Sequence, residues 1–162
     1  MTWREAFLRQ AVHEGAVWRK LNQENAPEWL QLHFLQMVTE KLAKGYLHPA
    51  TSDAPPVHSH GRFVKFLQTI KTNSRFKNQL GYSDTKSFKL YIESLLEQAQ
   101  RLQSLAPAIA GNANPNPEYP WQNRASLRIF VHAEYSFLEF KRQLPAMRKL
   151  TQLVEKLLVI AE

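Results

Sequence analysis

Apolar residues recur every three to four positions along most of the chain, which is the spacing of an amphipathic helix. Thr2 and Glu5 form a capping box, so a first helix is expected from Thr2 to about Lys20. Asn25 and Pro27 carry the signals of a second helix start. Further helices are expected at about 59–72, 83–105 and 132–161, with a short helical turn within 73–82. The pattern therefore predicts an all-α fold, a single up-and-down bundle of four to five helices formed by residues 1–162.

Two stretches interrupt the helical pattern. Residues 48–58 are rich in proline, serine and aspartate, and residues 106–123 hold four prolines through which no helix is expected to pass. Tyr119 and Trp121 are interpreted as anchors that hold this long Pro/Asn-rich loop against the bundle. Residues 126–131 are compatible with a short extended segment or a helix, and the last helix is expected to bend at Pro145. Because bundles usually have short connections, the two loops are the places to search for function.

The composition narrows the class of protein. The 162 residues are 44% hydrophobic, which is enough for one core. The absence of cysteine excludes disulfide bonds, cysteine-ligated zinc and a cysteine nucleophile. No apolar run approaches the roughly 20 residues that span a bilayer, and the first residues lack the apolar core of a signal peptide. We therefore expect a cytoplasmic protein that does not enter a membrane.

The positive charge is concentrated in one part of the chain. The net charge is +7, and residues 58–92 contribute seven basic residues against Asp84 alone. Such a cluster attracts phosphates, because each neutralised phosphate releases counterions. It predicts a surface for RNA, a nucleotide or an acidic partner, with a plain solvated face as the alternative. The expected binding residues are His58, His60, Arg62, Lys65, Lys71, Arg75 and Lys77.

Histidines supply the candidate chemistry. His58 and His60 precede Arg62 near an expected helix start, where they could bind an anion or act as acid and base on a phosphodiester. Arg128 and His132 form a second, catalytic candidate: they lie one turn apart in a helix, or on one face of an extended segment. The spacing of His58 and His60 is too weak a signal to predict a metal, and no cofactor is expected.

Other polar and aromatic residues are given structural roles. His33 is expected to be partly buried beside the apolar stripe of the second helix, and Glu40 and Lys44 are expected to form a surface ion pair at i,i+4 spacing. Phe63 and Phe66 follow the core spacing, which favours packing over base stacking. A Gly-rich phosphate loop, a GxSxG elbow, an HExxH helix and an EF-hand loop are all absent from the sequence.

Three segments resemble one known family. Residues 32–47, with the sequence LHFLQMVTEKLAKGYL, resemble the Q-x-x-x-EK-x-x-K-x-x-L helix of the HEPN family, the higher-eukaryote and prokaryote nucleotide-binding domain. Residues 58–67, HSHGRFVKFL, resemble the histidine-led third helix of that family. The stretch from EYPW at 118–121 to the last helix is similar to some bacterial members. The resemblance covers about 30–50 residues by motif, and the rest by architecture.

The resemblance implies a helical bundle that often dimerises, with roles in toxin–antitoxin, phage-defence and RNA-processing systems. Many members are metal-independent ribonucleases with an Arg-x(4–6)-His motif that acts on the scissile phosphate across a dimer cleft. No histidine in this chain has an arginine at that spacing. Arg128/His132 and Arg9/His13 are one residue too short, and Arg124/His132 is one too long. Non-catalytic relatives that bind nucleotides or partner nucleotidyltransferases fit this sequence better.

Three functions remain in order of preference. The first is a non-catalytic HEPN-like binding or regulatory module, expected to be a homodimer, for RNA, a nucleotide or a partner protein in a bacterial defence or toxin–antitoxin system. The second is a divergent metal-independent ribonuclease toxin that uses Arg128 and His132, or His58 and His60. The third is a structural subunit whose basic face docks an acidic protein.

Overall fold

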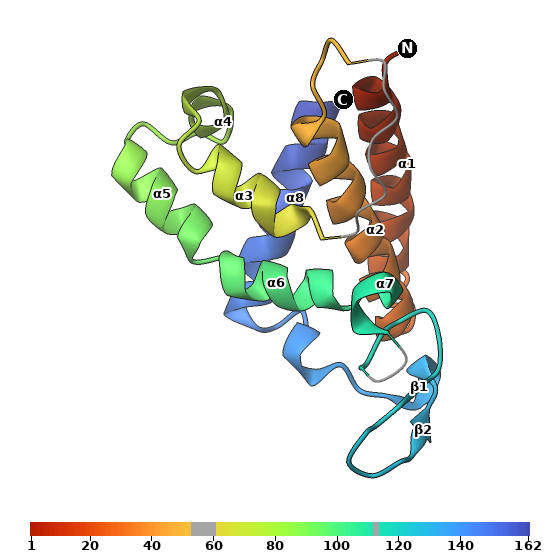
Figure 1. The fold of residues 1–162 in the computed structure, drawn as a ribbon. Helices are drawn as coiled ribbons and strands as arrows, with labels where there is room; N and C mark the ends of the chain where they lie inside the picture. The colour runs from red at the N-terminus through yellow and green to blue at the C-terminus, as the bar shows by residue number, and fades with distance from the viewer. Residues whose placement is uncertain (53–60, 112–113) are drawn as a thin grey trace.

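The computed structural model describes residues 1–52, 61–111 and 114–162, and it confirms the all-α fold. The α-helices are α1 (Trp3–Gln23), α2 (Glu28–Leu47), α3 (Phe63–Ile70), α4 (Ser74–Gln79), α5 (Thr85–Glu93), α6 (Leu96–Ser104), α7 (Pro107–Ala110) and α8 (Pro145–Ala161). Two short strands, β1 (Trp121–Gln122) and β2 (Ile129–Phe130), form an antiparallel ribbon, and two 3-10 turns, His132–Glu134 and Leu138–Phe140, precede α8. Figure 1 shows α1 and α2 side by side, with α3 to α6 extending to one side of them.

The most extensive helix–helix interface of the fold is the one between α1 and α2. The capping box of α1 is confirmed: the Thr2 backbone N–H donates to Glu5 Oε2 (2.8 Å), and the Glu5 backbone N–H donates to Thr2 Oγ1 (3.2 Å). The predicted cap of α2 is wrong, because Asn25 takes up a left-handed turn (φ +50°) and Pro27 precedes the helix with no side-chain cap. The helices approach closely at Gly45, where a Cβ would lie 2.6 Å from Leu8 Cδ2.

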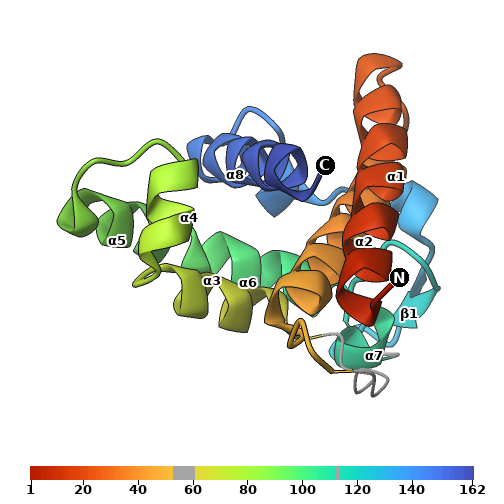
Figure 2. The same cartoon turned by 90° about the horizontal axis from the view of Figure 1, so that it is seen from above.

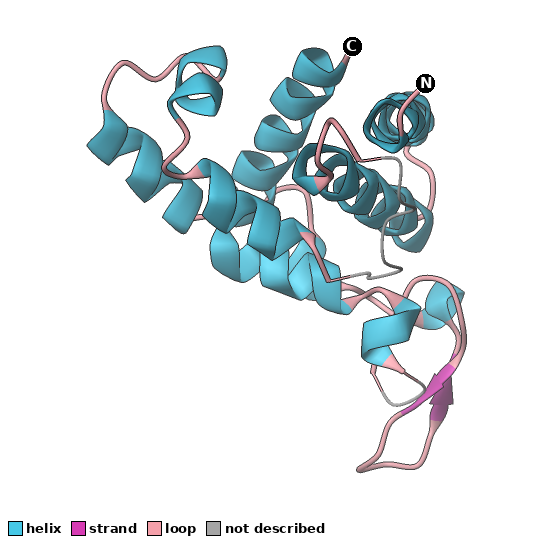
Figure 3. Cartoon of the chain, turned by 45° about the horizontal axis from the view of Figure 1, so that its top comes forward, coloured by secondary structure: helices cyan, strands magenta, loops and turns pink. Residues whose placement is uncertain are grey.

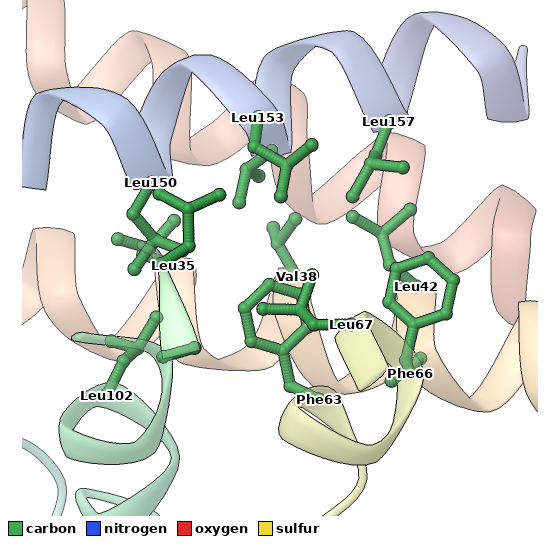
Figure 4. Packing of buried hydrophobic residues seen from close by; sticks show 14 of the residues in the cluster. Leu35, Val38, Leu42, Phe63, Phe66, Leu67, Leu102, Leu150, Leu153 and Leu157 are labelled. Carbon is green, nitrogen blue, oxygen red and sulfur yellow. The ribbon is translucent and has the colours of Figure 1, made fainter. Parts of the chain in front are cut away.

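α2 is the central helix, as its wide apolar stripe predicts. It packs against α1, α3, α6 and α8. Figure 4 shows how leucines and phenylalanines from four helices meet in the core. The labelled residues are all at most 2% exposed: Leu35, Val38, Leu42, Phe63, Phe66, Leu67, Leu102, Leu150, Leu153 and Leu157. This core fixes α3, and with it the basic segment of the chain, against the α1–α2 pair.

The helix expected at 83–105 is divided into two. α5 ends at Glu93 and α6 begins at Leu96, and the Ser94 hydroxyl donates to the Tyr91 carbonyl (2.7 Å) at the break. The change of direction lets α5 pack against α3 and α4 while α6 packs against α2, α3 and α8. Figure 2 shows α4 and α5 at the far end of this arm. Leu95 is fully buried at the break, so tertiary packing outweighs the continuous apolar stripe of the sequence.

The C-terminal third differs most from its prediction. A short helix, α7, lies within the stretch that was expected to exclude helices, because Pro107 occupies its first turn, where no N–H is needed. The helix expected from His132 begins only at Pro145, for the same reason: proline starts this helix rather than bending it. Trp121 is 3% exposed and anchors the loop, whereas Tyr119 is 55% exposed and does not.

The extended interpretation of residues 126–131 is confirmed for Ile129 and Phe130, which form β2. Trp121 pairs with Phe130 and Gln122 with Ile129. Figure 3 shows this ribbon projecting from the helices. No helix within the described ranges is long and apolar enough to cross a membrane.

Candidate functional site

The structure divides the predicted basic cluster into neutralised and open cations. Lys71 and Lys89 both pair with Glu93 of α5, at 3.6 and 4.0 Å. Lys77 Nζ donates to the Ser83 carbonyl (3.1 Å). In contrast, Arg62, Lys65 and Arg75 have no ion pair with any residue that the structure describes. These three side chains and exposed Lys86, which also has no ion pair among the described residues, are the part of the cluster that is free to bind an external anion.

The open cations lie at the two ends of α3. Arg62 directly precedes the helix, Lys65 is exposed in its first turn, and Arg75 is exposed in α4, which follows it. An eight-residue helix is about 12 Å long, so these ends are too far apart for a single phosphate to bridge. His58 and His60, predicted to share this site, lie outside the described residues.

A further arginine joins the site from a distant part of the sequence. Burial raises the pKa of Tyr46 to about 12, and the positive charges of Arg4 and Arg75 oppose that rise. Arg4 of α1 and Arg75 of α4 therefore both lie within electrostatic range of the Tyr46 side chain, whose hydroxyl donates to the Leu157 carbonyl (3.2 Å). No spacing in the sequence could have placed both arginines in range of one tyrosine, because this depends on how α1 packs on α2.

Aromatic packing holds α4 in this position. The Tyr46 and Phe66 rings stack with centroids 5.3 Å apart, and Phe76 meets both rings edge-on, at 5.1 and 5.7 Å. Phe63 and Phe66 are 2% and 1% exposed, which confirms that they pack in the core. Phe63 and Phe66 therefore cannot stack on bases, and we expect any nucleic acid bound here to be held mainly through its phosphates.

The predicted pair Arg128 and His132 contacts two different aromatic rings. The Arg128 guanidinium lies over the Phe130 ring, 5.1 Å from its centroid. The His132 ring packs on Trp29 of α2, with centroids 4.2 Å apart. Because β2 ends at Phe130 and a 3-10 turn begins at His132, neither a continuous helix nor a continuous strand connects the two residues.

His132 instead lies near His33, which is half-buried in α2 as predicted. Burial lowers the pKa of His33, Glu118 opposes this effect, and the charges of Lys41 and His132 add to it. Among the described residues, the buried Nδ1 atoms of His33 and His132 have no hydrogen-bond partner. A proton on Nδ1 of neutral His33 would be a buried donor without an acceptor, so the proton belongs on Nε2. Because taking up a proton at Nδ1 would create that same buried donor, His33 is poorly arranged to act as a base.

The α1–α2 interface contains charged residues that are almost fully buried. Glu40 and Lys44, predicted as a surface pair, are each 6% exposed, and Lys44 Nζ donates to Glu40 Oε1 at 2.6 Å. Lys41 lies 3.7 Å from the same oxygen, and Gln36 Nε2 donates to Glu40 Oε2 (3.3 Å). The surface prediction is wrong because i,i+4 spacing identifies neighbours on a helix but not the side that faces solvent.

Glu14 of α1 faces the same interface and was missed by the sequence analysis. It is 8% exposed, and its Oε1 accepts from Gln10 Nε2 (2.9 Å), while its buried Oε2 has no hydrogen-bond partner in the part of the chain that the structure describes. Burial raises the pKa of Glu14; Lys41 opposes the rise, and Glu40 adds to it. Buried ionisable groups are common at functional sites, although structural networks show them too.

A cavity of about 510 Å³ opens between the C-terminal half of α1, the start of α2 and the start of α8. Trp18, Leu35 and Met147 contribute apolar wall. Its polar groups are mostly occupied: Arg19 pairs with Glu155 (2.8 Å), and Arg142 donates to the Asn22 carbonyl (3.2 Å). Within the described ranges, no three His, Asp or Glu side chains lie close enough together to hold a metal ion.

Comparison with known proteins adds no assignment. No protein-family model, no curated protein and no solved structure matches this chain. The resemblance to HEPN proteins therefore rests on the sequence motifs alone.

Proposed function

We propose that this protein is a non-catalytic HEPN-like module that binds single-stranded RNA through the surface formed by Arg62, Lys65 and Arg75. One observation carries the proposal: these three cations lack a counter-charge among the described residues, while neighbouring Lys71 and Lys89 share Glu93. Unpaired cations keep their attraction for phosphate, whereas paired ones must first break an ion pair.

The distribution of the cations favours an oligonucleotide over a free nucleotide. Open charges lie at both ends of α3, and Arg4 lies within electrostatic range of Tyr46, as Arg75 does. A strand with several phosphates can contact both ends of α3, while a mononucleotide would reach only one. With Phe63 and Phe66 buried in the core, binding should depend little on base sequence. A role in a bacterial defence or toxin–antitoxin system, and a homodimeric assembly, follow from the resemblance only.

The test is fluorescence anisotropy with a labelled RNA of about 15 nucleotides over a salt series. Replacing the three residues together (Arg62→Glu, Lys65→Glu, Arg75→Glu) should weaken binding at least tenfold. It should also reduce the slope of log K against log salt by about 2, because each lost phosphate contact removes about 0.7. Arg4→Gln should weaken binding by a smaller factor.

The matched control changes the same amount of charge elsewhere. Lys141, Arg148 and Lys149 are exposed and have no ion pair among the described residues, so Lys141→Glu, Arg148→Glu and Lys149→Glu together should retain the salt slope. A triple α3–α4 variant that binds like the parent would refute the proposal. RNA cleavage without metal, lost in His132→Ala, would replace it with the ribonuclease alternative.

A further inference from the structure

The β1–β2 ribbon has two chemically different faces. Because Trp121 pairs with Phe130 and Gln122 with Ile129, the first pair points to one face and the second pair to the other. Trp121 is 3% exposed; it stacks on Phe130 within the ribbon at 5.9 Å, and its contacts with Tyr135 (5.0 Å) and Phe137 (6.3 Å) attach the ribbon to the segment that leads to α8. On the other face Ile129 is 67% exposed, and Leu127 at the adjacent turn is 70% exposed. Figure 3 shows that this end of the ribbon projects away from the helices.

Hydrogen bonds hold the turn of the ribbon, and Leu127 lies in it with a strained backbone conformation. Asn123 Oδ1 accepts from the backbone N–H groups of Ala125 (3.0 Å) and Ser126 (2.9 Å), and Gln122 Nε2 donates to the Leu127 carbonyl (2.9 Å). Leu127 has φ +54°, a left-handed conformation that a leucine rarely adopts and that glycine or asparagine would adopt freely. A leucine that is both strained and exposed contributes little to the fold, so its side chain points to a contact outside the chain.

The apolar pair is bordered by positive charge. Arg124 in the turn and Arg128 beside it are exposed, and neither has an ion pair with a described residue. The Arg128 guanidinium is held over the Phe130 ring, 5.1 Å from its centroid. The chain itself carries a net charge of +7, so a second copy is a poor electrostatic match for this surface.

We propose that the ribbon docks an acidic amphipathic helix of a partner protein. Leu127 and Ile129 would pack on the apolar stripe of that helix, and Arg124 would pair with a carboxylate beside the stripe. Arg128 is held over Phe130, on the face opposite Ile129, and is not part of this contact. RNA would use Arg124 but leave both aliphatic side chains exposed, whereas an acidic amphipathic helix uses all three. The ribbon is separate from the α3–α4 surface, so this proposal does not depend on RNA binding.

The experiment uses a fluorescein-labelled peptide of about 18 residues, five helical turns, with leucine at i, i+3 and i+4 positions and glutamate elsewhere. Anisotropy should show that the full-length protein binds this peptide at least tenfold more tightly than a version with lysine for glutamate. A version with glutamine for leucine should also bind at least tenfold more weakly. Leu127→Gly and Arg124→Ala should each weaken binding of the acidic peptide about tenfold.

Leu127→Gly is the decisive variant because it removes the side chain and relieves the backbone strain together. It should therefore fold at least as well as the parent, with the near-ultraviolet circular dichroism of the tryptophans retained. Leu90→Ser, which removes a leucine 57% exposed on α5, and Lys149→Ala are the matched controls and should bind within twofold of the parent.

Each other outcome overturns the proposal. Failure of the parent to bind the acidic peptide, or equal binding by Leu127→Gly, would show that the ribbon is not a docking element of this kind. A dimer in sedimentation that Leu127→Gly dissociates would identify a second copy as the occupant. Loss of RNA binding in Arg124→Ala with Arg128→Ala, but not in Leu127→Gly, would assign the ribbon to nucleic acid.

Discussion

α2 buries two faces of opposite chemistry to almost the same extent. Leu35, Val38 and Leu42 are at most 2% exposed against α3, α6 and α8, while Glu40 and Lys44 are 6% exposed against α1. Burying an aliphatic side chain stabilises the fold by about 1.5–3 kcal/mol. A buried ion pair stabilises the fold little or no more than an apolar pair of the same volume, because the cost of desolvating the charges offsets their attraction. Stability therefore explains the first face and does not explain the second.

The charged face has instead a geometric role that an apolar one would lack. Lys44 Nζ lies 5.7 Å from the centroid of the Phe7 ring of α1, and Glu14 of the same helix lies near Lys41 and Glu40. A slide or rotation of α1 along α2 would remove the Lys44–Phe7 contact and move Glu14 away from Lys41, whereas the Glu40–Lys44 pair lies within α2 and would remain. These contacts across the interface favour one register of the two helices, the one in which Arg4 lies within electrostatic range of Tyr46.

The largest effect should come from breaking the charged face. Lys44→Met removes the 2.6 Å contact and leaves the Glu40 carboxylate buried beside Lys41 alone among the lysines, so the free energy of unfolding should fall by about 4 kcal/mol. The double variant Glu40→Leu with Lys44→Met should recover to within about 1 kcal/mol of the parent. Urea unfolding followed by circular dichroism measures both. A double variant as unstable as the sum of its single changes would show that the face is needed for stability itself.

On the apolar face, a second substitution should not restore the stability that the first one removes. Leu42 is fully buried, so Leu42→Ala should lower the free energy of unfolding by about 3 kcal/mol through lost burial and a residual cavity. No second substitution to alanine nearby should restore it, because cavities add rather than cancel. Leu90→Ala on the exposed side of α5 is the control and should change the free energy by less than about 0.5 kcal/mol. Recovery in Leu42→Ala with Leu153→Ala would remove the distinction between the faces.

The sequence predicts the apolar face well because helical periodicity reports which residues share a side. Phe63 and Phe66 were assigned to the core from their spacing, and both are buried. The charged face escaped prediction because Glu40 and Lys44 have the same spacing whether they face water or α1. Glu14 escaped because only the packing of α1 on α2 brings it near Lys41.

The candidate binding surface was predicted in part. Residues 58–92 do contain an excess of basic residues. The charge count for this segment excluded Glu93, the next residue, which pairs with Lys71 and Lys89. Charge counted along a chain ignores the partners that folding supplies. The boundaries of the C-terminal elements were missed because Pro107 and Pro145 start helices here, and proline alone does not say whether it starts or ends one.

The smallest effect should be a pH dependence confined to the charged face. The pKa of Glu14 is raised above its ordinary value of 4.5 by burial, so the folded state binds more protons than the unfolded state in the window just above pH 4.5. Stability should therefore fall as the pH rises through that window and then level off above the raised pKa. Glu14→Gln keeps an acceptor for Gln10 but cannot ionise, so it should gain stability relative to the parent as the pH rises.

Urea unfolding at pH 4 to 8 measures this difference in stability, with Glu134→Gln on an exposed turn as the control. If the difference in unfolding free energy between Glu14→Gln and the parent stays constant over this pH range, the pKa of Glu14 is not raised by its burial at the interface.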